Sequence, residues 1–84
     1  MGLKLRLEWF DKQSEKFQGE EFSDDLGDDE SVLNALEIPV ENNINNGGFN
    51  VVSQWVAIIQ PYFRHTIEVT DSDYQISFDY RENW

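Results

Sequence analysis

The sequence contains no cysteine, and only six of its 84 residues are lysine or arginine. Without cysteine the chain can form neither a disulfide nor a zinc–thiolate site, which fits a reducing compartment. Phosphate groups are bound by clustered lysine and arginine, and this chain has too few of them to form such clusters. We therefore expect neither nucleic acid nor an anionic membrane surface as its ligand.

Long apolar runs are also missing. No stretch approaches the roughly 18 apolar residues that a membrane helix needs. The first ten residues, MGLKLRLEWF, lack the apolar core of a secretory signal. We therefore expect a cytoplasmic protein. A chain of 84 residues is long enough for one modest core, so we predict a single domain over residues 1–84.

Aromatic residues and acidic residues are abundant. Phe, Trp and Tyr make up 14% of the chain, and 17 acids against six bases give a net charge of −11. Disordered acidic segments are poor in aromatic residues, so the composition indicates a folded acidic domain. Such a charge favours encounter with basic partners.

Alternating hydrophobicity predicts the first strands. In residues 3–10 the odd positions are apolar, whereas the even positions are polar until Phe10, a large apolar residue on the polar face. This period of two is typical of a half-buried strand. Residues 17–23 predict a second strand, antiparallel to the first across a polar turn. Gly19 is a weak point or a bulge in this strand. The phase is ambiguous, because Phe17 and Phe22 would face opposite sides of a regular strand.

The middle of the chain is less regular. Residues 24–30 form an acidic loop, residues 31–36 predict a short helix, and residues 42–48 predict an ordered loop or tight turn. Residues 51–62 have helical spacing but many β-branched side chains, which favours an irregular or short helical crossover. We expect Pro61 to end that crossover.

The C-terminal part alternates again over residues 65–70 and residues 74–80, which predicts a β-hairpin across the turn at residues 71–73. The fold class is therefore α+β. We expect a single antiparallel β-sheet with a short α-helix and loops covering one face, and with the other face open.

Candidate catalytic and metal sites are weak. His65 is the only histidine and has no serine or cysteine motif beside it, so a structural or surface histidine is favoured. Paired carboxylates would suit a two-carboxylate hydrolase, but that chemistry needs a concave pocket. The sequence DDLGDDE at residues 24–30 does not match a calcium-binding loop. We expect no enzyme, no cofactor and no dedicated metal site.

The layout of charge is more informative than any of these motifs. No lysine or arginine occurs between Lys16 and Arg64, and the acids of this stretch follow closely on Phe10 and Phe17. A solvated loop that only confers solubility is the alternative. However, aromatic residues ringed by charge are common at the energetic centres of protein interfaces. The acids of the base-free stretch are Glu20, Glu21, Asp24, Asp25, Asp28, Asp29, Glu30, Glu37 and Glu41.

Several short segments resemble the cloacin immunity protein family over nearly the whole chain. The matching segments are MGLKL and WFDK within residues 1–12, GEE at 19–21, GDD at 27–29, NN-x-NNG at 42–47, QPYF at 60–63 and SFDYR at 77–81. The resemblance implies a four-stranded antiparallel sheet with a short helix. It also implies a cytoplasmic protein that is no enzyme.

The resemblance further implies a partner. Members of this family bind the basic C-terminal ribonuclease domain of a cognate colicin or cloacin that cleaves ribosomal RNA. We therefore expect a tight heterodimer that protects the producing cell. Whether the immunity protein leaves the cell together with the toxin is left open. The alternative from the residues alone is a general acidic binding module or nucleic-acid mimic that binds basic proteins.

The resemblance also implies roles for individual residues. Phe10 and Phe17 match aromatic positions that anchor the toxin in relatives. Gly48 lies where relatives differ in residue and in the toxin recognised, and Gln75 lies where relatives carry Phe. The predicted toxin-binding residues are Phe10, Phe17, Glu20, Glu21, Asp24, Asp25, Asp28, Asp29, Glu30, Gly48, Gln75 and Asp79.

Overall fold

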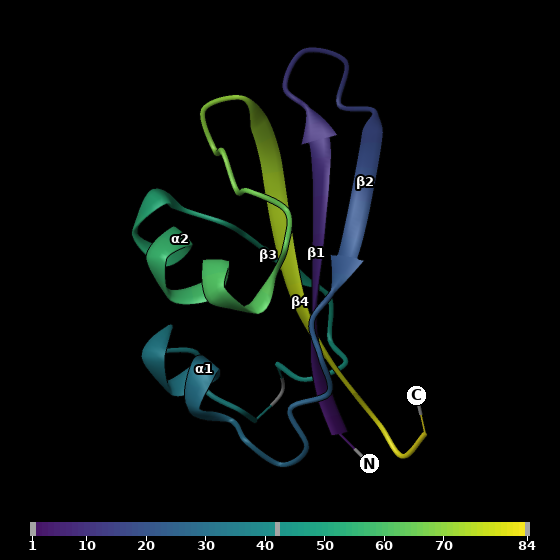
Figure 1. The fold of residues 1–84 in the computed structure, drawn as a ribbon, viewed down its shortest axis with the longest axis vertical. Coiled ribbons are helices and arrows are strands. Elements are labelled where there is room, and N and C mark those ends of the chain that lie inside the picture. The colour runs from purple at the N-terminus through teal and green to yellow at the C-terminus, as the bar shows by residue number, and fades with distance from the viewer. Residues whose placement is uncertain (1, 42, 84) are drawn as a thin grey trace.

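The fold is built on one four-stranded antiparallel sheet. The computed structural model describes residues 2–41 and 43–83, so Met1, Asn42 and Trp84 of the predicted domain lie outside the described residues. The strands are β1 (Gly2–Asp11), β2 (Phe17–Phe22), β3 (Gly48–Asn50) and β4 (Ser72–Arg81). Their order is β2-β1-β4-β3, with the two long strands in the centre (Figure 1). The predicted α+β class with an antiparallel sheet is confirmed.

Helices cover one face of the sheet. α1 (Ser31–Ala35), α2 (Ser53–Ile59) and the 3-10 helix η1 (Gln60–Tyr62) all lie on the same side of the strands (Figure 1). Residues 51–62, which the sequence left between irregular and helical, are therefore mainly helical. No helix in residues 2–41 and 43–83 has the length and apolar character needed to span a membrane.

The core lies between the helices and the sheet. The predicted alternation of β1 is confirmed, because Leu3, Leu5 and Leu7 are at most 1% exposed. Their long apolar side chains are removed from water, which supplies most of the driving force for folding. The helices and β4 complete this core with Val32, Leu33, Ile59, Ile76 and Phe78.

The predicted hairpin over residues 65–80 is wrong, because residues 65–70 form no strand. Side chains satisfy their backbone instead. The Gln60 amide accepts a hydrogen bond from the Ile67 N–H at 2.8 Å and donates to the His65 carbonyl at 2.8 Å. Ile67 is buried, as the alternation predicted. The pattern therefore identified the inward side chain but not the backbone partner.

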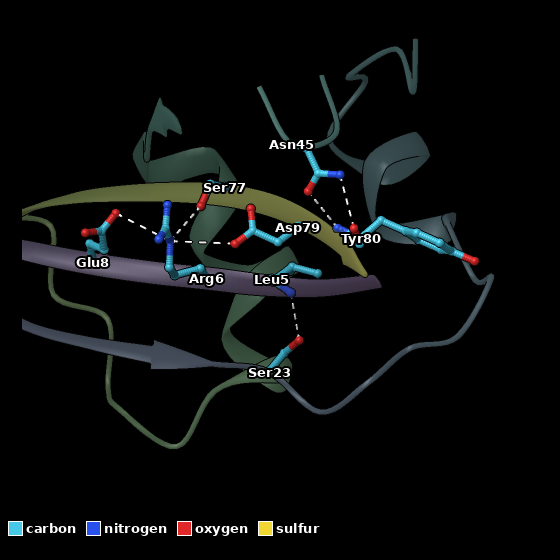
Figure 2. Close-up of polar contacts among 8 residues, drawn as sticks. All are labelled: Leu5, Arg6, Glu8, Ser23, Asn45, Ser77, Asp79 and Tyr80. Carbon is cyan, nitrogen blue, oxygen red and sulfur yellow. Dashed lines mark hydrogen bonds and ion pairs between the residues drawn. The ribbon is translucent and has the colours of Figure 1, made fainter. Parts of the chain in front are cut away.

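The fourth strand is β3, which begins at Gly48, the last residue of the loop or turn predicted over residues 42–48. Its three residues, Gly48–Asn50, pair with the part of β4 from Ser77 to Gln75. The preceding loop is ordered, because the Tyr80 N–H donates to Asn45 Oδ1 at 2.9 Å and Asn45 Nδ2 donates to the Tyr80 carbonyl at 3.1 Å (Figure 2). The Asn45 side chain thus continues the hydrogen bonding to β4 beyond the end of β3.

Candidate functional site

One face of the sheet, which we call the open face, is not covered by the helices (Figure 1). Residues on it follow from the strand registers and from alternation with the buried leucines of β1. The open face carries Lys4, Arg6, Glu8, Phe10, Phe17, Glu20, Phe22, Gly48, Asn50, Asp73, Gln75, Ser77 and Asp79.

Two phenylalanines form a pair at one end of the open face. The rings of Phe10 and Phe17 meet edge to face with centroids 5.7 Å apart, and Phe17 is 54% exposed. A bulge places them together: Trp9 pairs with Gly19, but Phe10 pairs with Phe17, so Gln18 is the extra residue. The bulge, which the sequence suggested at the neighbouring Gly19, sets the phase that the sequence left open: Phe22, opposite Arg6, shares the face of Phe17.

The structure brings Gly48 and Gln75 together on neighbouring strands. A Cβ atom on Gly48 would lie 3.5 Å from Gln75 Oε1, in ordinary contact. The Gln75 amide in turn donates to Asn50 Oδ1 at 3.5 Å. A shallow hollow beside them is lined by Phe10, Asn50, Asp73 and Gln75. Gly48 and Gln75, the two positions that the resemblance led us to expect to differ from relatives, thus lie together in one small polar area beside the aromatic pair.

Arg6 lies near the centre of the open face. Its Nε–H donates a hydrogen bond to Ser77 Oγ at 3.2 Å. The same nitrogen is 3.7 Å from Glu8 Oε1 and 4.0 Å from Asp79 Oδ2 (Figure 2). One base therefore lies between two acids from adjacent strands.

The acidic loop of residues 24–30 lies at the other end of β1. The Leu26 N–H donates to the Leu3 carbonyl at 2.8 Å, and the Leu3 N–H donates to the Gly27 carbonyl at 2.9 Å. Phe10 is seven residues further along β1, roughly 23 Å away at about 3.3 Å per residue. The expectation that these acids adjoin Phe10 and Phe17 is therefore wrong, because the length of the strand separates them.

A family model described as cloacin immunity protein matches residues 2–81. The chain belongs to the cloacin immunity protein family. It is therefore a bacteriocin immunity protein, and proteins of this family act on a cognate cloacin or colicin as binders and inhibitors rather than as catalysts. The resemblance seen in the sequence is confirmed over nearly the whole chain.

Several acids of this immunity protein hold local structure. Asp25 Oδ1 accepts a hydrogen bond from the Gly27 N–H at 2.8 Å, and Asp28 Oδ1 accepts one from the Tyr80 hydroxyl at 2.8 Å. Asp29 Oδ1 accepts the Ser31 N–H at 2.9 Å, and this bond lowers the pKa of the Asp29 carboxyl. The hydrogen bond that Tyr80 donates to Asp28 raises the pKa of the Tyr80 hydroxyl. Of the remaining acids in this loop, Asp24 is exposed and Glu30 is half-buried.

Glu21 lies on the covered side of the sheet, opposite Leu7. Its carboxylate accepts the Arg64 N–H at 2.8 Å and the His65 N–H at 2.9 Å. It therefore ties β2 to the segment after η1. Among the predicted toxin-binding residues, those on the open face are Phe10, Phe17, Glu20, Gly48, Gln75 and Asp79.

The single histidine packs inside the covered face. The His65 ring stacks on Trp9 with centroids 3.8 Å apart and an interplanar angle of 13°. Its Nε2 is 2.7 Å from the Tyr74 hydroxyl, at hydrogen-bond distance. This arrangement favours the structural interpretation of His65. Within the described residues, no group of three or more His, Cys, Asp or Glu side chains could hold a metal ion.

Seven open-face residues were missing from the predicted site: Lys4, Arg6, Glu8, Phe22, Asn50, Asp73 and Ser77. The period of two in β1 already placed Arg6 and Glu8 beside Phe10, and this signal could have identified them. For Phe22 the only signal was Gly19 as a possible bulge, next to the extra residue Gln18, and it did not settle which face Phe22 occupies.

Proposed function

We propose that this immunity protein inhibits the basic C-terminal ribonuclease domain of a colicin or cloacin that cleaves ribosomal RNA, and that it does so by docking through the open face. The observation that carries the proposal is the Phe10–Phe17 pair, in which Phe17 is exposed and Phe10 is half-buried, on a sheet face that the helices do not cover. Exposed aromatic pairs surrounded by polar residues are common at the energetic centres of interfaces.

The size of the molecule fits a stable heterodimer. A standard interface buries about 800 Å² per partner, which is about 15% of the 5396 Å² surface of this protein. A sheet face four strands wide offers an area of that order. The immunity protein would act as a single domain over residues 1–84. It would bind the toxin in the cytoplasm, where the toxin would otherwise reach the ribosomes of the producing cell.

Acids and aromatics would contribute differently to binding. The net charge of −11 attracts a basic domain over distances on the order of the Debye length and accelerates encounter. Phe10 and Phe17 supply apolar area that becomes fully buried only in the complex. We therefore assign Asp24, Asp28 and the other loop acids to steering, and the aromatic pair to retention of the bound toxin.

A second candidate function is a general acidic module or nucleic-acid mimic. It is favoured by the position of the 24–30 loop, whose acids lie far from the aromatic pair and need no anchor to attract a basic protein. A mimic should bind many basic proteins and lose its affinity steeply as salt rises. A selective inhibitor should retain much of its affinity, because its anchors are apolar.

The test is a calorimetric titration with purified ribonuclease domains of this toxin class, at about 50 mM and about 500 mM salt. We expect at least one domain to bind at nanomolar concentration or below, about −12 kcal/mol, and to stop inhibiting translation in a ribosome assay. If every domain binds more weakly than micromolar and translation stays inhibited, the proposed function is wrong. Equal binding of unrelated basic proteins, lost in salt, would support the mimic.

A further inference from the structure

We propose that Arg6 is a positioning residue, which holds the carboxylates of Glu8 and Asp79 as two fixed acceptors for basic side chains of the partner. This inference rests on the proposed function and deepens it, because it specifies how the centre of the open face recognises a basic surface. It assigns to a positively charged residue a favourable effect on binding a positively charged partner.

The position of the Arg6 side chain is fixed by a buried serine. Arg6 on β1 stands directly opposite Ser77 on β4, and its Nε–H donates to Ser77 Oγ at 3.2 Å. Ser77 is only 4% exposed, so its hydroxyl is a rigid acceptor. Side chains of directly paired residues lie close enough for such contacts. The hydrogen bond at Nε therefore holds the guanidinium group in the middle of the open face.

The two carboxylates approach Arg6 from different strands. Glu8 lies two residues along β1, whereas Asp79 lies on β4 opposite Lys4, diagonal to Arg6. At 3.7 Å and 4.0 Å from the Arg6 Nε they form ion pairs rather than hydrogen bonds. Both carboxylates therefore keep acceptor capacity toward solvent, and their side chains are 25% and 15% exposed.

The local charge makes Arg6 necessary for this arrangement. Glu8 also stands opposite Glu20 on β2, and its partner on β4 is the neutral Gln75. Neighbouring carboxylates repel one another, so without Arg6 we expect Glu8 to turn outward into solvent and Asp79 to face Lys4, the residue directly opposite it. With Arg6 present, the group of two acids and one base keeps a net charge of −1. It remains attractive to a basic partner while its acceptors are ordered.

Positioning and simple charge attraction predict opposite results. Arg6→Gln changes the net charge from −11 to −12. If only the total charge mattered, a basic ribonuclease domain would bind this variant faster and more tightly. If Arg6 orders the two acceptors, the variant binds more weakly in spite of its greater negative charge. The sign of the change therefore separates the two explanations.

The experiment measures the Kd of the cognate ribonuclease domain for the full chain and its variants by calorimetry. Arg64→Gln is the matched control, since it removes the same charge and its backbone is tied to Glu21 on the covered side. We expect Arg6→Gln to weaken binding by about tenfold or more, whereas Arg64→Gln leaves Kd unchanged or lowers it slightly. Binding by the unaltered protein is established first, so that failure of the proposed function is recognised separately.

A variant cycle distinguishes positioning from a loss of fold. In a Glu8→Gln, Asp79→Asn background, Arg6→Gln should cause no further loss, because its targets are already absent. Arg6→Lys, which keeps the charge but lacks the shared Nε–H donor, should lose less affinity than Arg6→Gln, and thermal unfolding checks each variant. The inference is overturned if Arg6→Gln behaves like Arg64→Gln, or if it weakens binding equally in the neutralised background.

Discussion

Phe10 shows at the scale of one residue how the open face would bind a partner. Its ring meets Phe17 edge to face on an uncovered surface, so its truncation should leave the core untouched. We expect Phe10→Ala to weaken binding of the cognate ribonuclease domain by about 2 kcal/mol or more, the scale of an interface hot spot. Calorimetric titration measures the loss, and urea unfolding should show a free energy of unfolding close to that of the original protein.

The matched control for Phe10 is Val52→Ala. Val52 is an apolar residue that is 46% exposed, whereas Phe10 is half-buried, and Val52 lies at the N-terminus of α2 on the helical side. Its truncation should leave the Kd unchanged. If Phe10→Ala and Val52→Ala have the same Kd as the unaltered protein, Phe10 does not anchor the partner.

Leu5 represents the opposite case, a residue that acts only through the fold. It is fully buried in the middle of β1 and contributes to the core. Leu5→Ala removes apolar contacts and leaves a cavity, so the free energy of unfolding should fall by about 2–5 kcal/mol. Urea denaturation followed by tryptophan fluorescence measures this. A variant as stable as the original would show that the Leu5 side chain is not part of the core.

Tyr80 gives the fold a dependence on alkaline pH. Its hydroxyl donates to Asp28, and this bond to a carboxylate raises the pKa of Tyr80 above its ordinary value of 10.0. The bond therefore stabilises the protein fully below about pH 10. That stability is lost as pH rises through the raised pKa of the folded state. We expect the stability difference between the original protein and Tyr80→Phe to shrink at alkaline pH.

Urea unfolding at a series of pH values from about 8 to about 12 measures this difference. Asp28→Asn is the control, because it removes the charged acceptor and should shrink the alkaline loss of stability in the same way. A stability difference between the original protein and Tyr80→Phe that stays constant through this range would contradict the assigned bond.

At the scale of the element, the bulge in β2 shapes the proposed binding surface. It lets Phe17 join Phe10, and it occurs beside Gly19, which stands opposite Trp9 on the covered face. A Cβ atom on Gly19 would come within 2.6 Å of the Trp9 ring, and that ring cannot retreat freely because it stacks on His65. Glycine is thus required for the close approach of β2 to the indole.

We expect Gly19→Ala to destabilise the protein by about 1–3 kcal/mol, the usual cost of overpacking. Urea unfolding measures the loss, and Gln18→Ala is the control, since Gln18 is exposed and is the unpaired residue of the bulge. Equal stability of both variants would mean that the Trp9 ring moves away at little cost. The contact would then not be what fixes the bulge.

Elements with a long regular pattern could be predicted from the sequence, and short or irregular ones could not. The ten residues of β1 and of β4 alternate over their buried parts and were placed correctly. β3 has only three residues, and its Gly and Asn favour turns, so alternation had nothing to detect. Residues 65–70 alternate as a strand would, but the Gln60 side chain takes the place of a neighbouring strand.

The same reasoning explains the mixed outcome for the candidate site. Phe10, Gln75 and Asp79 could be placed on one face because their strands alternate regularly. Glu21 could not, since the bulge at Gln18 left the phase of β2 undetermined. The acids of residues 24–30 follow Phe17 closely in sequence. They nevertheless lie at the far end of β1, because β2 runs antiparallel to β1 and carries the chain back to that end.

At the scale of the whole molecule, we assign attraction of the partner and final contact with it to different parts of the surface. The acids of residues 24–30 lie at one end of the sheet, and the aromatic pair lies at the other end of the open face. We propose that the negative field guides a basic domain toward the molecule from a distance. In this proposal the final contact depends on Phe10, Phe17 and the acids around Arg6.

The most direct test of this account is an NMR titration of the isotope-labelled protein with the unlabelled cognate ribonuclease domain. The account predicts that the largest changes in amide signals fall on the strands of the open face, at residues 6–10, 17–22 and 75–79. The amides of α1 and α2, on the covered side, should change little. Changes centred on the helices, or on the loop of residues 24–30 alone, would contradict docking through the open face.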